Sequence, residues 1–121
     1  MTRADVSRLT LLSKGTISNH VADLLAEGLL YEEHEGDQQR NVGLRLNRDA
    51  GRAIGIELWP GACRGVLTDM TMKPLKHAER QLDSTSVEEA VAGIVSLTEE
   101  LLRGVEQACV GLVIGMPGPT D

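Results

Sequence analysis

Aromatic side chains are almost missing from this chain. Trp59 and Tyr31 are the whole set and phenylalanine does not occur, so aromatics make up 2% of the 121 residues. Any core must therefore be built from leucine, valine, isoleucine and alanine, without the large area that each buried aromatic ring adds. The length leaves room for one domain, or for two small or incomplete ones.

Long apolar runs and paired cysteines are also missing. No stretch approaches the roughly 18 consecutive apolar residues that a membrane-spanning helix needs. The first residues, MTRADVSR, lack the apolar core of a secretory signal. Cys63 and Cys109 stand alone, without the spacing of a zinc motif. We therefore expect no membrane contact, no metal, and two buried thiols in a reducing cytoplasm.

Acidic residues outnumber basic ones, because the chain has 18 Asp and Glu but only 12 Lys and Arg, which gives a net charge of −6. The balance is different at the beginning, where residues 1–22 hold Arg3, Arg8 and Lys14 against Asp5. A protein that reads DNA needs a local basic face and not a basic total, so the net charge does not exclude DNA binding.

The first thirty residues follow a helical pattern. The segment 4–10 is a short amphipathic stretch, and within 14–27 the residues Ile17, Val21 and Leu24 recur at helical spacing. Ser13 is placed to cap the second helix, and Gly28 to end it in the left-handed conformation. The sequence thus predicts two consecutive helices.

A hairpin is predicted directly after these helices. The polar segment 32–41 contains Gly36-Asp37, a turn pattern between a strand beginning near Leu29 and a strand at 42–46. Two helices followed by a two-stranded hairpin is the order of a winged helix-turn-helix. We place a domain boundary in the polar connector that follows it, which gives a DNA-binding domain at 1–48.

The residues from 52 onward alternate between strand and helix patterns. Ser86 and Glu89 form a capping-box pattern at the start of the predicted helix. The last predicted strand is apolar throughout, which favours burial on both of its faces. The predicted elements are strands at 53–58, 62–68 and 75–82, a helix from 87 to about 107, and a strand at 110–114.

Four polar residues of the second helix are candidates for contacting DNA. In a helix-turn-helix, the second helix lies in the major groove with its N-terminal residues at the base edges. Lys14, Thr16, Ser18 and Asn19 occupy those outward positions, and Asn can pair with adenine through two hydrogen bonds. Arg40, in the predicted wing, could reach a phosphate. The alternative is an ordinary helical hairpin with a polar face and a solvated turn arginine.

Three motifs, in this order along the chain, resemble the N-terminal part of the ROK family of bacterial repressors and sugar kinases. They are LSKGTISNHVADLLAEGLL, LRLNRDAGRAIGIEL and VGLVIGMPGPTD. The resemblance implies an α+β or α/β protein in two parts: an incomplete winged helix-turn-helix at 1–48 whose first helix is missing, then the first part of an actin-like, ribonuclease-H-like ATPase fold at 52–121. It also implies a cytoplasmic homodimeric repressor that binds a double-stranded DNA operator and responds to a sugar or sugar phosphate.

The same resemblance suggests where the sugar binds and why catalysis is not expected. The loop GMPGPTD is similar to the family loop beside the sugar, which points to Gly115, Gly118 and Asp121. Family kinases hold ATP phosphates with a glycine-rich turn where this chain has Trp59-Pro60. Proline removes an amide donor there, so we expect no ATP cofactor and no catalytic residue. The alternatives are a fragment of a sugar kinase, and a remnant that folds only as an oligomer or not at all.

Overall fold

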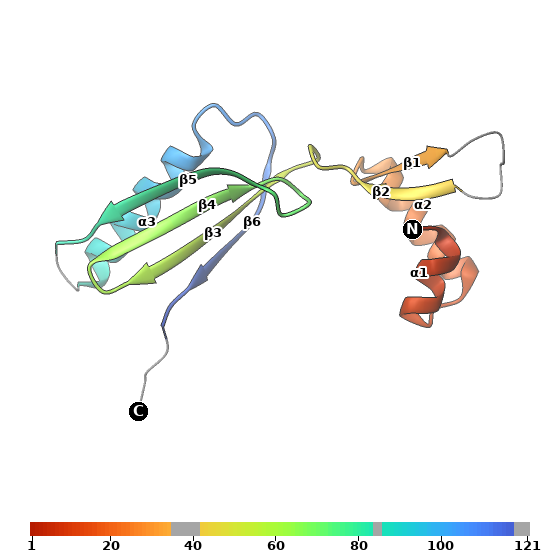
Figure 1. Cartoon of the computed structure of the whole chain (residues 1–121), viewed down its shortest axis with the longest axis horizontal. Helices are drawn as coiled ribbons and strands as arrows, with labels where there is room; N and C mark the ends of the chain where they lie inside the picture. The colour runs from red at the N-terminus through yellow and green to blue at the C-terminus, as the bar shows by residue number, and fades with distance from the viewer. Residues whose placement is uncertain (35–41, 84–85, 118–121) are drawn as a thin grey trace. The chain divides into compact units, whose positions relative to one another are not determined.

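The computed structural model describes residues 1–34, 42–83 and 86–117 (Figure 1). The chain separates into two compact units, Met1–Ala50 and Gly51–Asp121, each of which is described by itself. Within the described residues, every helix is too short or too polar to cross a lipid bilayer.

The first unit consists of two helices and an antiparallel hairpin. Its elements are α1 (Arg3–Thr10), α2 (Lys14–Ala26), β1 (Leu30–His34) and β2 (Val42–Leu46). Thr2 and Asp5 form a capping box at the start of α1, and Ser13 caps α2 by accepting a 3.2 Å hydrogen bond from the amide of Thr16. Gly28 follows α2 with a φ of +76°, a conformation that favours glycine.

A small core holds the first unit together. Ile17 and Val21 from α2 and Leu44 from β2 are buried, and Val6 and Leu25 pack against them. The amide of Leu44 also donates a 2.6 Å hydrogen bond to the carbonyl of Met1, which ties the beginning of the chain to the hairpin. The predicted periodicity of α2 is confirmed, because the residues spaced for one face are the ones that are buried.

The second unit is an α+β arrangement with a mixed sheet. Its elements are β3 (Arg52–Trp59), β4 (Ala62–Thr68), β5 (Pro74–Gln81), α3 (Val87–Leu102) and β6 (Cys109–Gly115). The strand order is β5-β4-β3-β6. The first three strands are antiparallel neighbours, whereas β6 runs parallel to β3. Helix α3 is the crossover that parallel pairing requires.

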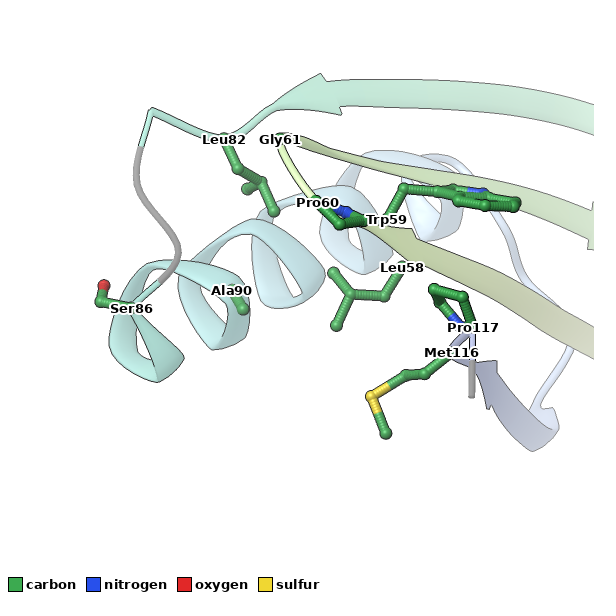
Figure 2. A pocket seen from close by; sticks show the side chains of 9 residues that line it. All are labelled: Leu58, Trp59, Pro60, Gly61, Leu82, Ser86, Ala90, Met116 and Pro117. Carbon is green, nitrogen blue, oxygen red and sulfur yellow. The ribbon is translucent and has the colours of Figure 1, made fainter. Parts of the chain in front are cut away.

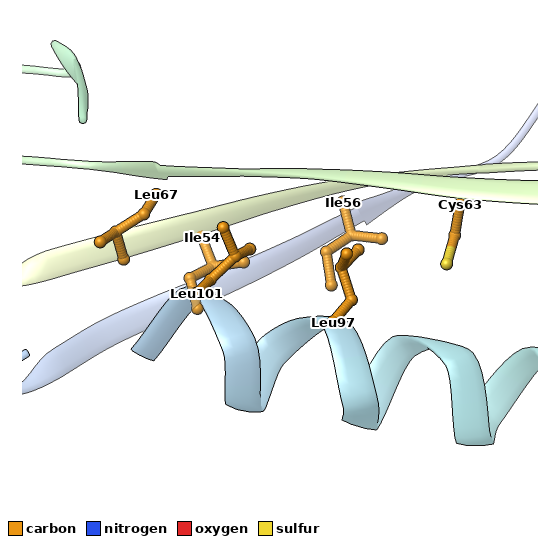
Figure 3. Close-up of a cluster of buried hydrophobic side chains, with 6 residues drawn as sticks. All are labelled: Ile54, Ile56, Cys63, Leu67, Leu97 and Leu101. Carbon is orange, nitrogen blue, oxygen red and sulfur yellow. The ribbon is translucent and has the colours of Figure 1, made fainter. Parts of the chain in front are cut away.

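The core of the second unit lies between α3 and one face of the sheet (Figure 3). Alternate residues of β3 and β4 point toward the helix, as the two-residue period of a strand dictates. Gly65 lets the helix approach closely, since a Cβ at that position would lie 2.8 Å from Leu101 Cδ1 and 2.9 Å from Leu97 Cδ2. The buried residues are Ile54, Ile56, Cys63, Leu67, Leu97 and Leu101.

Two predictions made from the sequence are wrong for this unit: the residue at which α3 ends and the burial of β6. Helix α3 ends at Leu102 and not near residue 107, because Gly104 takes a φ of +76° and turns the chain. Strand β6 is exposed along its whole length and is not buried on both faces. The reason is its place, since β6 forms the edge of the described sheet while α3 packs on β3, β4 and β5.

The two thiols also differ from each other. Cys63 is buried in the core beneath α3, whereas Cys109 at the beginning of β6 is exposed. The prediction of two buried thiols is therefore wrong for Cys109, for the same reason that β6 as a whole is exposed.

Candidate functional site

Helix α2 presents three of its four candidate residues to solvent. Lys14, Ser18 and Asn19 are exposed, while Ile17 and Val21 on the other side of the helix are each only 4% exposed. Successive residues of an α-helix are about 100° apart, so this division creates one polar and one apolar face. The exposed face is free to meet another molecule without disturbing the core.

Thr16 is less available than the other candidates. It is half-buried, and its hydroxyl accepts a 2.9 Å hydrogen bond from the hydroxyl of Ser13. The amide of Thr16 donates to the same Ser13 oxygen. Thr16 therefore belongs to the cap that begins α2, and any contact it makes outward competes with that cap.

The acidic residues of β1 are neutralised by arginines. Arg3 Nη2 lies 2.6 Å from Glu32 Oε1, and Arg45 Nε lies 2.6 Å from Glu33 Oε2. The hydrogen bond from Arg3 lowers the pKa of the Glu32 carboxyl below its ordinary value. These pairs reduce the repulsion that β1 would exert on a phosphate backbone, but they also occupy two cations of the unit.

Lys14 is in a different situation from these arginines. Arg8 pairs with Asp5, whereas Lys14 makes no ion pair with a described residue. It stands in the first turn of α2, where the helix carries no acidic residue and the dipole favours an anion. The beginning of α2 thus combines an available cation with a positive helix end.

Of the four remaining candidate residues, the structure describes Gly115. Arg40, Gly118 and Asp121 lie outside the described residues. Gly115 is the last residue of β6 and pairs with Glu57 of β3 across the parallel ladder. The structure thus brings one predicted ligand residue to the carboxyl end of two adjacent strands.

A cavity of about 260 Å³ opens beside these strand ends (Figure 2). Because β3 and β6 are parallel, their carboxyl ends meet at one edge of the sheet, which is where open sheets commonly bind ligands. The N-terminal half of α3 closes another side. The lining residues are Leu58, Trp59, Pro60, Gly61, Leu82, Ser86, Ala90, Met116 and Pro117.

The side chains around this cavity are mainly apolar. In Figure 2, Leu58, Met116 and Pro117 lie close together, and the indole of Trp59 extends away from Ser86 and Ala90. Trp59 is 41% exposed. Among the described lining residues, the polar side-chain groups are the indole N–H of Trp59 and the hydroxyl of Ser86, which accepts a 3.2 Å hydrogen bond from the amide of Glu89.

The cavity itself could not be foreseen from the sequence. Its walls come from segments that are far apart in the sequence, and among the described residues Gly115 is the predicted ligand residue that precedes one of them. Within the described residues, no group of three or more His, Cys, Asp or Glu is placed to hold a metal ion. The site is therefore a mainly apolar cavity with few polar side chains.

Comparison with known proteins finds relatives that match this chain over nearly its whole length. A xylose repressor of Bacillus spizizenii is 30% identical over 127 residues, which cover 100% of this chain and 33% of that protein. A putative xylose repressor of Caldicellulosiruptor is 28% identical over 131 residues, covering 98% and 31%. The chain thus spans about a third of the length of these relatives. No family model matches it.

A solved structure shares the fold. It is described as a ROK family transcriptional regulator, homologous to the Escherichia coli MLC protein. The TM-score is 0.75 at 18% sequence identity, and the match covers 98% of this chain and 32% of the other. At this level of identity the likeness concerns the fold alone.

Proposed function

We propose that this chain, which belongs to the ROK family, forms the N-terminal part of a cytoplasmic, sugar-responsive transcriptional repressor. Residues 1–48 would be a winged helix-turn-helix with α2 as its recognition helix. Residues 52–121 would begin a sensor domain with the actin-like, ribonuclease-H-like ATPase fold. The repressors among its relatives support this proposal, and α2 carries it, because its polar face lies opposite a buried apolar one.

Each candidate on α2 has a role that matches its chemistry. Asn19 would pair with an adenine in the major groove, and Ser18 would contact a neighbouring base or phosphate. Lys14 would neutralise a phosphate at the positive end of the helix. Arg40, in the proposed wing, would contact a second phosphate. A homodimer would repeat the recognition helix and bind a palindromic operator with half-sites about one or two turns apart.

The relatives also suggest the effector and the absence of catalysis. Proteins called xylose repressors support a pentose as the sugar. Gly115, Gly118 and Asp121 would lie beside it, as the resemblance to the family's sugar loop implies. A sugar kinase is less well supported, since Trp59-Pro60 stands where the family's kinases carry a glycine-rich phosphate turn. Pro60 has no amide proton to offer a phosphate.

Two variants of α2 test this function by fluorescence anisotropy. Duplexes selected from a random pool by the wild-type chain are compared with scrambled duplexes at two salt concentrations. Asn19→Ala should cost roughly 1–3 kcal/mol on the selected duplex and relax the base preference at one position. Lys14→Ala should weaken both duplexes alike and reduce the salt slope by about 0.9, the contribution of one phosphate contact.

Glu79→Ala, on the exposed side of β5 in the other unit, serves as the control and should leave DNA binding unchanged. If Asn19→Ala keeps both the affinity and the base preference of the wild type, α2 is not the recognition helix. If the wild-type chain retains no duplex from the pool, the proposed DNA binding is wrong.

A further inference from the structure

We propose that Gly15 sets the distance between α2 and DNA, and that its missing side chain is what allows Asn19 to reach a base. This inference rests on the proposed function and adds to it a positioning residue, which acts through Asn19. It is carried by the surroundings of Gly15, by its place on the helix and by the length of the side chains beside it.

The folded chain itself gives no reason for a glycine at position 15. Gly15 is exposed in the first turn of α2, and its φ lies outside the left-handed region that favours glycine. A Cβ added there would have no atom within 4 Å. Glycine also weakens a helix relative to alanine, because it has more conformational freedom to lose on folding. The fold should therefore be at least as stable with a larger residue at this position.

Glycines elsewhere in the chain show what an internal reason looks like. Gly28 takes a φ of +76° where the chain leaves α2. At Gly93 of α3, an added Cβ would lie 2.7 Å from Leu82 Cδ2, so packing requires the glycine. Gly15 meets neither condition. The close approach of another molecule is the use that is left for its missing side chain.

Gly15 lies on the same side of α2 as the candidate residues Ser18 and Asn19. These follow it by three and four positions, the spacing at which residues of a helix are neighbours. Side chains of an α-helix lean toward its N-terminus, so those of Ser18 and Asn19 extend over the turn that contains Gly15. All three residues are exposed. A base that pairs with Asn19 would therefore lie next to the Cα of Gly15.

The short side chain of Asn19 makes the distance to the DNA critical. A single methylene separates its carboxamide from the Cα, whereas the ammonium of Lys14 stands at the end of a flexible four-carbon stem. A bulky residue at position 15 would hold α2 away from the base edges. Lys14 could still reach a phosphate from that distance, but Asn19 could no longer form two hydrogen bonds with adenine. Gly15 should thus affect base preference more than the electrostatic part of binding.

Two substitutions at position 15 test this in the anisotropy assay with selected and scrambled duplexes. Gly15→Leu should weaken binding to the selected duplex by about tenfold or more, as loss of a bidentate base contact does, and Gly15→Ala by less. Binding to scrambled duplexes and its salt slope should remain those of the wild type. Ala92→Leu adds the same side chain at an exposed position of α3 and should change neither. Wild-type affinity of Gly15→Leu for the selected duplex would overturn the proposal.

The double variant with Asn19→Ala shows whether Gly15 acts through Asn19. In the Gly15→Leu background, Asn19→Ala should weaken binding by less than about twofold, because the contact is already lost. If the two losses of affinity instead multiply, Gly15 acts independently of Asn19 and the positioning role is wrong.

Thermal unfolding followed by circular dichroism excludes a loss of folding as the cause. Gly15→Leu should unfold at the wild-type temperature or above it, since leucine favours a helix over glycine. A lower midpoint would show that Gly15 serves the fold, which contradicts the proposal.

The outcome for Asn19→Ala alone separates this inference from the proposed function. If Asn19→Ala relaxes the base preference while Gly15→Leu leaves it intact, the role of Gly15 is wrong and α2 remains the recognition helix. If Asn19→Ala changes nothing, or the wild type retains no duplex, the proposed function is wrong and the role of Gly15 fails with it.

Discussion

Replacing Leu97 by alanine should remove a large share of the stability of the second unit. Leu97 is completely buried and points from α3 toward Ile56 of the sheet (Figure 3). The Cδ2 atom of Leu97 packs against Gly65, and a Cβ added to Gly65 would lie only 2.9 Å from that atom. With little free space around it, the site cannot collapse to fill the gap that a smaller side chain leaves.

The expected loss follows from the atoms removed. Leu→Ala deletes three carbons, which at about 0.8 kcal/mol per buried methylene amounts to roughly 2.4 kcal/mol. The remaining cavity adds to this, and measured Leu→Ala costs in cores run from about 2 to 5 kcal/mol. We therefore expect a loss of about 3–4 kcal/mol. A domain of the size of Gly51–Asp121 has a total stability of about 4–11 kcal/mol at roughly 0.05–0.15 kcal/mol per residue.

The assay is urea unfolding followed by tryptophan fluorescence. Trp59 is the single tryptophan and lies in the second unit, so its fluorescence reports that unit. Leu97→Ala should lower the midpoint with little change in the slope. Val95→Ala, at a half-exposed position of the same helix, should cost less than about 1 kcal/mol, because alanine favours the helix. If the two variants unfold at the same urea concentration, Leu97 is not part of a packed core.

Two further predictions concern titration and thiol chemistry. The amide and hydroxyl of Thr2 and the guanidinium of Arg8 lower the pKa of the Asp5 carboxyl. The stability that this carboxylate gives α1 is therefore present above the ordinary aspartate pKa of about 3.9 and is lost as the pH falls through the lower folded value. Circular dichroism should show helix loss in acid that Asp5→Asn reduces. Burial raises the pKa of the Cys63 thiol, so Ellman's reagent should modify Cys109 quickly and Cys63 only in urea. Rapid release of two equivalents from the folded chain would contradict this.

Local chemistry was sufficient to predict the elements of the fold. Helix α2 was predicted at 14–27 and extends over Lys14–Ala26, because Ser13 caps one end, Gly28 turns the chain at the other and apolar residues recur at helical spacing. The strands were found for the same reason, since their patterns end at turn residues such as Pro60-Gly61. The predicted end of α3 was wrong because the apolar pattern continues beyond Leu102, whereas Gly104 turns the chain there.

The candidate face of α2 could also be read from the sequence, because helical spacing alone separates Asn19 from Ile17 and Val21. Spacing could not show that Thr16 is engaged with Ser13, nor that Arg3 and Glu32 are neighbours across 29 positions. Hydrogen bonds and ion pairs of that kind depend on where the chain returns in space. They determine which cations and hydroxyls are available to a partner.

The sequence by itself thus determined the order of helices and strands, their caps and the polar face of α2, since each depends on residues within a few positions of one another. Only the tertiary structure decided that β6 pairs with β3 at the edge of the sheet, and that its apolar residues are therefore exposed. It also decided that the ends of β3 and β6 meet the beginning of α3 around one cavity. An apolar strand has the same local pattern at the centre and at the edge of a sheet. Its neighbours are set by contacts between distant segments.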